Sequence, residues 1–228
     1  MRPLVPLIAA LALSVSACQP PPGDPRRPIF ADVPATIDPT ARFLFHLHGT
    51  VVEEQGPAGR SRHGQYLYYP TVEALADRGF VVISEVRPPT QVVPYAIKVA
   101  GQVARLRAAG VPADHITVNG VSKGGVIALL TTITIADPDV RFVIMACCLR
   151  GGNLASAFAA LGQRPPRGRV LSLYDHDDPE IGTCAHFFPA APGLGFEEIV
   201  LTTGRGHALF FSPETVWVDR VVEWARAP

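Results

Sequence analysis

The sequence predicts an α/β fold, with a mostly parallel central sheet of about six strands and helices on both faces. From about residue 41 onward, short apolar runs alternate with longer segments of helical pattern, which is typical of strand–helix–strand units. The runs 81–83 and 142–145 contain only Val, Ile, Phe and Met, as expected for strands buried on both faces of a parallel sheet. Gly79 and Gly110 follow helical segments and favour their termination.

The elements follow from local composition, taken in chain order. Six apolar or β-branched runs bounded by turn residues are expected as strands: Phe43–Leu47 (FLFHL), Phe80–Glu85 (FVVISE), Ile116–Asn119 (ITVN), Phe142–Cys147 (FVIMAC), Val170–Tyr174 (VLSLY) and Glu198–Leu201 (EIVL). Five intervening segments are expected as helices: Tyr69–Arg78, Tyr95–Ala109, Lys123–Ile135, Asn153–Leu161 and Pro213–Ala227. In such sheets the ligand site lies at the carboxyl ends of the strands.

Length and charge narrow the class of protein. The chain has 228 residues, of which 48% are hydrophobic, and this suits one domain with a substantial core. Its formal net charge is +0, so no basic face that would track a phosphate backbone is implied. Nucleic acid is therefore not expected as a partner.

The N-terminal residues are predicted to be a targeting segment. Residues 1–17 combine Arg2, an apolar stretch and small residues before Cys18, which is the pattern of a signal peptide. Val15-Ser16-Ala17-Cys18 resembles a bacterial lipoprotein box, which implies lipidation of Cys18 and a membrane-anchored protein facing the periplasm or exterior. Residues 18–40, rich in Pro up to Pro28, then form a tether, and 41–228 form the folded domain. The alternative is an ordinary secretory signal that is cut after Ala17 and releases a soluble protein.

Export changes the interpretation of the remaining cysteines. Cys147 and Cys148 end one predicted strand, and Cys184 follows the next one. In an oxidising compartment, Cys184 can form a disulfide with either member of the pair. The alternative is three small buried thiols. No C-x-x-C spacing is present, which disfavours a zinc or redox motif.

A G-x-S-x-G element, Gly120-Val121-Ser122-Lys123-Gly124, lies between a predicted strand and a predicted helix. A sharp strand-to-helix corner strains the backbone, and flanking glycines relieve the crowding. The serine hydroxyl then projects at the carboxyl edge of the sheet. Ser122 is therefore a candidate nucleophile.

A serine nucleophile needs a base, and the base needs an orienting acid. His207, flanked by glycine in Gly204-Arg205-Gly206-His207, follows the last predicted strand. The preceding strand ends in three aspartates: Asp175, Asp177 and Asp178.

The order serine, acid, histidine resembles the α/β-hydrolase fold over most of the chain beyond residue 40. In that family the acid commonly lies in a Gly-x-x-Asp-Pro pattern, which favours Asp178, ahead of Asp175 and then Asp177. Asp175 stands where family members often carry glycine, so the choice stays open. The resemblance also implies an oxyanion hole made by the backbone amides of Lys123 and Thr50, the latter from His48-Gly49-Thr50. A serine hydrolase acting on a carboxylic ester or related acyl bond is the expected activity, without a cofactor.

Other interpretations remain. His46 and His48 form an H-x-H pair of the kind that metal-dependent amidohydrolases carry, but the chain is short for their eightfold barrel and shows only six strands. No metal site is therefore expected. The same triad would also serve a peptidase or an acyltransferase. A cell-envelope lipoprotein that uses a hydrolase scaffold only for binding is a further alternative.

Two segments bear on a small-molecule substrate. Only about 20 residues separate the strand ending at Cys147 from the one starting near Val170, so a small lid or none is expected. Between Thr50 and Tyr69, the cationic residues Arg60, Arg62 and His63 are candidates for an anionic substrate group. In the same insert, Tyr66, Tyr68 and Tyr69 either wall a pocket or pack against their own loop.

Overall fold

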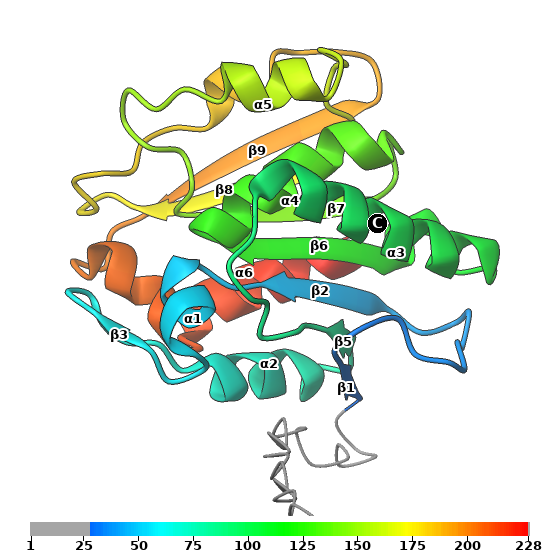
Figure 1. Ribbon diagram of the computed structural model, residues 1–228, viewed down its shortest axis with the longest axis horizontal. Helices are drawn as coiled ribbons and strands as arrows, with labels where there is room; N and C mark the ends of the chain where they lie inside the picture. Colours follow the sequence, from blue (N-terminus) through cyan, green and yellow to red (C-terminus); the bar gives the residue numbers. More distant parts are fainter. Residues whose placement is uncertain (1–27, 228) are drawn as a thin grey trace, which may run out of the picture.

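The computed structural model describes residues 28–227 (Figure 1). The predicted signal peptide 1–17, Cys18 and the tether up to residue 27 lie outside the described residues. Within the described range, no helix is long and apolar enough to cross a bilayer.

A seven-stranded sheet forms the centre of the molecule, and all of its strand pairs are parallel. The strands lie in the order β1-β5-β2-β6-β7-β8-β9. Their bounds are β1 (Ile29–Phe30), β2 (Phe43–Leu47), β5 (Val81–Ile83), β6 (Ile116–Val121), β7 (Arg141–Met145), β8 (Gly168–Asp175) and β9 (Leu194–Leu201). All the carboxyl ends of these parallel strands therefore meet at one edge.

Helices cover both faces of this sheet. The longer ones are α2 (Tyr68–Ala76), α3 (Val92–Ala108), α4 (Lys123–Ile135) and α6 (Thr215–Arg226), and the short ones are α1 (Thr50–Gln55) and α5 (Ala155–Ala160). Helices α3 and α4 pack together on one face, and α2 and α6 contribute to the core of the other (Figure 1). The sheet is thus the middle of three layers.

Alternation along the strands explains the two cores. In β7, Phe142 and Ile144 join the core under α3 and α4, whereas Val143 and Met145 join the core under α2 and α6. Successive side chains of a strand point to opposite faces, so a strand covered on both sides is apolar over most of its length. All five residues of β7 are buried, and four of them, Phe142 to Met145, are apolar.

The predicted fold class is confirmed, and two predicted elements, Phe43–Leu47 and Lys123–Ile135, have the observed bounds. The other predicted elements differ at their ends; β9, for example, begins at Leu194 rather than at Glu198. Further differences lie near the N-terminus. Ile29 and Phe30 pair with β5, so the folded part of the chain extends into the range 18–40 that was predicted as a tether. The insert after β2, expected as a loop, carries helix α1 and a small hairpin of β3 (Arg60–Ser61) and β4 (Gly64–Gln65).

Candidate active site

Ser122 occupies the turn between β6 and α4, at the carboxyl edge of the sheet. Its backbone has φ 54° and ψ −122°, a conformation with positive φ that L residues rarely adopt. The Ser122 N–H donates to the carbonyl of Met145 at 2.8 Å, which fixes the strained turn to the end of β7. Strain of this kind persists only where the surrounding structure imposes it.

The glycines of the motif are required by close approaches. A Cβ at Gly120 would collide with the carbonyl of Gly124, and a Cβ at Gly124 would collide with the carbonyl of Leu47. Gly49, after β2, lies directly against the serine, since a Cβ there would come within 3.3 Å of Ser122 Cβ. The β2–α1 turn and the serine turn are therefore in contact.

His207 and Asp178 lie side by side at this edge. His207 Nδ1 donates to Asp178 Oδ2 at 2.8 Å, and the two side chains are 11% and 1% exposed. Because a carboxylate only accepts, this contact places the proton on Nδ1 and leaves Nε2 as the basic nitrogen. Gly206 packs against the Asp177 carbonyl. This contact holds the segment that carries His207 against residues 176–180, called the aspartate loop below.

The other two aspartates have different positions. Asp175 accepts hydrogen bonds from the N–H of Asp177 at 2.9 Å and from the N–H and hydroxyl of Thr203 at 3.0 and 2.5 Å. Burial alone would raise the pKa of Asp175, but these hydrogen bonds hold it below its usual range. Asp177 is exposed and contacts His176 at 3.3 Å. Of the three candidates, Asp178 is the one bonded to His207.

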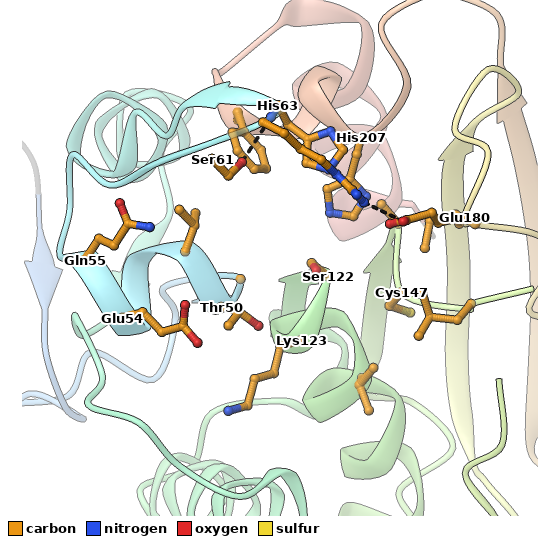
Figure 2. A pocket seen from close by; sticks show the side chains of 18 of the residues that line it. Thr50, Glu54, Gln55, Ser61, His63, Ser122, Lys123, Cys147, Glu180 and His207 are labelled. Carbon is orange, nitrogen blue, oxygen red and sulfur yellow. Dashed lines mark hydrogen bonds and ion pairs between the residues drawn. The ribbon is translucent and has the colours of Figure 1, made fainter.

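A cavity of about 700 Å³ opens above Ser122 (Figure 2). Gly49, Thr50, Ser122, Lys123 and His207 all line it. Part of its wall is apolar, formed by Val51, Val92, Val126, Cys147, Leu149 and Ile181. The segment between β7 and β8 carries one short helix, α5, which has no buried residue, in accordance with the prediction of a small lid or none.

The β3–β4 hairpin forms another side of the cavity. Arg62 pairs with Glu180 of the aspartate loop at 2.5 Å, and their side chains are 66% and 48% exposed. The His63 ring lies 4.9 Å from the ring of His207, centroid to centroid. Burial and the neighbouring His207 lower the pKa of His63. The sequence had suggested His63 only as a contact for an anionic substrate.

The tyrosines of the insert do not line this cavity. Tyr66 and Tyr68 are buried in the core that includes α2 and α6, whereas Tyr69 is 47% exposed. Tyr68 shares a 2.8 Å hydrogen bond with Ser84. Tyr66 and Tyr68 thus belong to the core and neither wall the pocket nor pack only against their own loop.

His46 and His48 bind protein groups through both ring nitrogens. His48 Nδ1 donates to the carbonyl of Gly49 and Nε2 accepts from the N–H of Arg87, both at 2.9 Å. His46 contacts Asn119 at 3.2 Å and Tyr66 at 3.4 Å. Burial lowers the pKa of His46 to about 3 and that of His48 to about 4, so both rings are neutral.

A buried ionic network lies beside the serine and was not predicted from the sequence. Glu53 Oε1 accepts from Lys123 Nζ at 2.5 Å and from the N–H of Thr90 at 2.6 Å. Glu53 Oε2 lies 3.1 Å from the Arg87 guanidinium, and these two side chains are 2% and 1% exposed. The Lys123 ammonium is held by Glu53 and by the Thr90 carbonyl, the latter at 2.6 Å.

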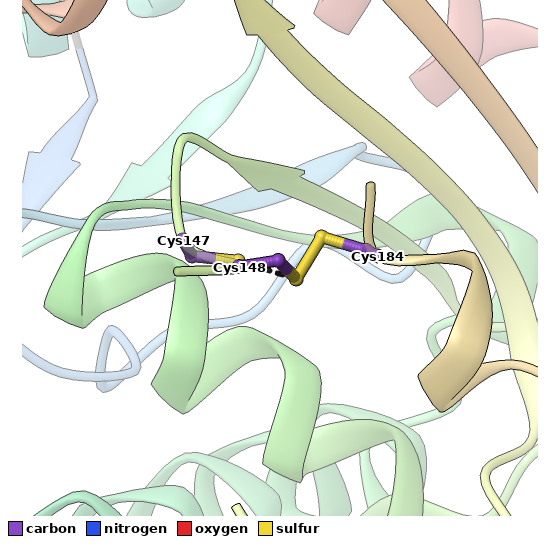
Figure 3. Close-up of side chains that lie close together, drawn as sticks. All are labelled: Cys147, Cys148 and Cys184. Carbon is purple, nitrogen blue, oxygen red and sulfur yellow. Dashed lines mark hydrogen bonds between the residues drawn. A yellow bond between two sulfur atoms is a disulfide. The ribbon is translucent and has the colours of Figure 1, made fainter. Parts of the chain in front are cut away.

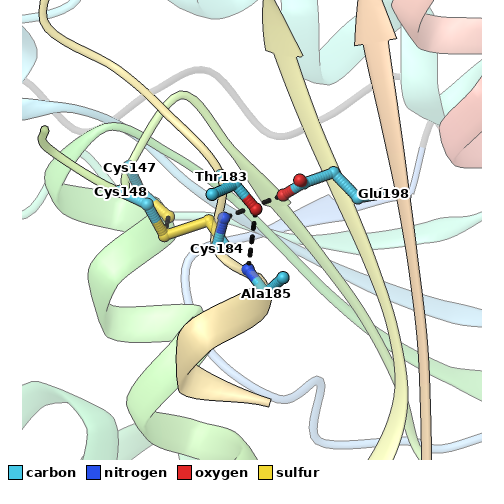
Figure 4. The surroundings of a disulfide bond; sticks show 6 residues. All are labelled: Cys147, Cys148, Thr183, Cys184, Ala185 and Glu198. Atoms are coloured by element: carbon cyan, nitrogen blue, oxygen red, sulfur yellow. Dashed lines mark hydrogen bonds between the residues drawn. A yellow bond between two sulfur atoms is a disulfide. The ribbon is translucent and has the colours of Figure 1, made fainter. Parts of the chain in front are cut away.

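The structure pairs Cys148 with Cys184, with a sulfur–sulfur distance of 2.04 Å (Figure 3). Cys147 is a buried free thiol whose sulfur lies 3.8 Å from that of Cys148. Glu198 accepts from the N–H of Cys184 at 2.8 Å (Figure 4). The disulfide joins the end of β7 to the segment that follows the aspartate loop.

That junction is reinforced by backbone contacts. Leu149 and Ile181 form an isolated antiparallel bridge. The N–H of Arg150 donates to the carbonyl of Glu180 at 2.8 Å, and that of Gly182 donates to the carbonyl of Cys148 at 2.9 Å. The aspartate loop is thus fixed on one side by His207 and on the other by the segment after β7.

No protein-family model matches this sequence, and no curated protein matches it. Solved structures do resemble it. SOBER1 from Arabidopsis thaliana is 13% identical, with a TM-score of 0.57 over 82% of this chain and 99% of that one. A Klebsiella pneumoniae protein with a provisional assignment as a dienelactone hydrolase is 17% identical, with a TM-score of 0.51 over 86% and 90%. An arylesterase is 14% identical, with a TM-score of 0.50 over 81% and 74%.

At these identities the likeness concerns the fold. The parallel sheet flanked by helices is of the α/β-hydrolase type, and these neighbours share this fold. The chemistry of this chain has to be argued from its own residues.

Proposed function

We propose that this protein is a serine hydrolase that cleaves carboxylic esters through an acyl-enzyme on Ser122. The observation that carries the proposal is the 2.8 Å hydrogen bond between His207 and the buried Asp178, together with the position of His207 in the same cavity as Ser122 on its strained turn. An acid bonded to a histidine, next to a serine, is the arrangement that activates a serine hydroxyl group in serine hydrolases.

The proposed reaction uses Nε2 of His207, the ring nitrogen that is not bonded to Asp178. His207 Nε2 removes the proton from the Ser122 hydroxyl as its oxygen attacks the ester carbonyl, and then protonates the departing alcohol. Asp178 keeps the imidazole oriented and stabilises its charged form. Water, activated by the same nitrogen, hydrolyses the acyl-enzyme and frees Ser122.

The tetrahedral intermediate needs donors for its oxyanion. We assign this role to the backbone amides of Thr50 and Lys123. Support comes from the contact of Gly49 with Ser122 and from the position of Lys123 directly after the nucleophile. Each such donor is worth about 2.7–4 kcal/mol of transition-state stabilisation.

The cavity favours a small acyl substrate. Its apolar side, which includes Val126 and Cys147, suits a short hydrocarbon group, while Arg62 and Glu180 at the hairpin side suit polar groups. No cofactor enters the proposed steps. Amide hydrolysis and acyl transfer would use the same residues, so amide substrates and an added alcohol acceptor belong in the test.

Labelling and kinetics test this function. A fluorophosphonate probe should label the purified protein, and Ser122→Ala should abolish labelling, whereas Ser156→Ala on exposed α5 should not change it. p-Nitrophenyl esters of increasing chain length should be hydrolysed, with the highest rates for short chains. Absence of labelling together with background rates would overturn the enzyme assignment in favour of a binding role. Labelling with hydrolysis of amides alone would indicate a peptidase, and rates that depend on an added alcohol would indicate an acyltransferase.

We also propose that the protein is exported and lipidated at Cys18. The apolar leader before Cys18 and the pairing of Cys148 with Cys184 support export, since disulfides persist in oxidising compartments. The expected result is a lipid-modified N-terminus at Cys18 by mass spectrometry, lost in Cys18→Ser. A mature chain that starts at Cys18 without a lipid would indicate a secreted protein instead.

A further inference from the structure

The buried network around Glu53 joins three segments that meet at Ser122. Glu53 belongs to α1, Lys123 begins α4, and Arg87 and Thr90 lie between β5 and α3. Each carboxylate oxygen has a cationic partner, and Oε1 also accepts the N–H of Thr90. One side chain therefore connects the turns that follow β2, β5 and β6.

Burial of these charges calls for a reason other than stability. Removing a carboxylate and a guanidinium from water costs several kcal/mol each, and apolar residues of similar volume would often be as stable. An ion pair, unlike apolar packing, fixes the separation and orientation of the groups that carry it. The network therefore points to a functional role for the three segments that it joins.

Two of the segments hold the proposed oxyanion donors. Thr50 lies one helical turn before Glu53 on α1, so the carboxylate and the Thr50 amide move together. Lys123 provides the other amide. Its side chain extends away from Ser122 (Figure 2), and its ammonium group donates to Glu53. The Glu53–Lys123 bond thus links the two helices, α1 and α4, that begin with these amides.

Arg87 connects the same network to the turn at Gly49. Its N–H donates to His48 Nε2, and His48 Nδ1 donates to the carbonyl of Gly49. The guanidinium also lies 5.4 Å from the centre of the Tyr95 ring, which restrains it further. The turn that contacts Ser122 is therefore held through His48 as well as through α1.

We infer that Glu53 is a positioning residue that fixes the separation of the Thr50 and Lys123 amides through its bond to the Lys123 ammonium. The inference rests on the proposed function, because it assigns these amides to the oxyanion. Hydrogen bonds that strengthen in the transition state govern kcat, whereas uniform substrate binding governs KM. Loosening the donors should therefore lower kcat with little change in KM.

The test compares Glu53→Gln, Lys123→Met and the double variant with the intact protein on p-nitrophenyl acetate. Each single change should lower kcat about 10- to 100-fold, since misplacing a catalytic group by about 1 Å can cost about 100-fold. KM should stay within about threefold. The double variant should be no slower than the slower single one, because both changes break the same bond. Lys123→Arg, which keeps the charge, should recover most of the rate.

Asp219→Asn is the control, since Asp219 pairs with Arg78 on the exposed surface of α6. It should leave kcat unchanged. If Glu53→Gln does not fold, Lys123→Met carries the test alone, because the Lys123 side chain is 24% exposed and tolerates an uncharged replacement better.

An unchanged kcat in a folded Lys123→Met variant would overturn the inference, as would a loss confined to KM or additive losses in the double variant. These results are separable from failure of the proposed function. In that case the intact protein would show no hydrolysis that depends on Ser122, whatever residue stands at position 53.

Discussion

Two walls of the cavity are held by ion pairs of opposite character. On the α1 side, Glu53 and Arg87 are almost fully buried, at 2% and 1% exposure. On the hairpin side, Arg62 and Glu180 are 66% and 48% exposed. Buried charges are intolerant of losing a partner, whereas exposed pairs are screened by water and salt. The chain thus fixes the wall next to the Ser122 turn and leaves the outer wall easier to rearrange.

The aspartate loop tests this comparison most strongly. It carries Glu180, which belongs to the exposed ion pair, and also Asp178, the proposed acid. Asp178→Asn should lower kcat about 10⁴-fold, as the same change does in other serine triads, since an amide no longer holds His207 in the tautomer that leaves Nε2 free to accept a proton. Asp175→Asn should change kcat less than about tenfold and mainly lower stability. Ester hydrolysis by both purified variants measures this. A larger loss for Asp175→Asn would transfer the role to Asp175.

Arg87→Met tests the buried wall. It leaves Glu53 with one cationic partner fewer in a buried site, so the free energy of unfolding should fall by about 3–5 kcal/mol. Urea denaturation followed by circular dichroism measures the change. A fall in the free energy of unfolding of less than about 1 kcal/mol would mean that the buried network contributes no more to stability than an exposed ion pair does.

His46 and His48 make the stability of the folded protein depend on pH. The pKa of His46 is lowered to about 3 and that of His48 to about 4, so both stay neutral in the folded protein while the unfolded chain binds protons below about 6.5. The unfolded state then holds more protons, and stability rises with pH. From pH 7 to pH 5 the free energy of unfolding should fall by about 4 kcal/mol, about 2 from each ring.

Urea denaturation at the two pH values measures this fall, and His46→Gln should reduce it by about 2 kcal/mol. A flat profile between pH 5 and 7 would contradict neutral rings at these sites. The carboxylates with lowered pKa, Glu53 and Asp175, do not contribute in this window, because their stabilising effect is lost only at lower pH.

Arg62→Ala should have the smallest effect. The expected loss of stability is under about 1 kcal/mol, and it should vanish in about 1 M salt, because exposed pairs are screened. Denaturation at low and high salt measures it. A loss as large as that of Arg87→Met would remove the distinction between the two walls.

The sheet could be predicted because every buried strand carries its own local signal. Continuous apolar runs located β2 and β7, and the strand–helix context of Gly120 to Gly124 located the turn of Ser122. Two residues are too few for periodicity, so β1 was missed, and its pairing with β5 extends the folded part toward the N-terminus. The short α1 lacks the length that helical periodicity needs.

The site was predictable where chain order carries the information. The order of Ser122, the three aspartates and His207 placed them at one edge, but only the structure distinguishes Asp178, bonded to His207, from Asp175, bonded to Thr203. Glu53 and Arg87 have no such signal. A single charged residue in sequence suggests a solvated position, and a pair separated by 34 positions in the numbering has no periodicity that reveals it.

The Cys148–Cys184 bond has a consequence for cleavage of the chain. It closes a covalent ring that contains α5, β8 and Asp178, with a sequence separation of 36 between its ends. The segment around α5, which has no buried residue, is a part of this ring that a protease can reach. A cut there opens the ring but leaves two fragments joined, so they migrate as one species until a reductant is added. The aspartate loop stays attached at both of its neighbours, and the nicked protein keeps the residues of its site on one covalent framework.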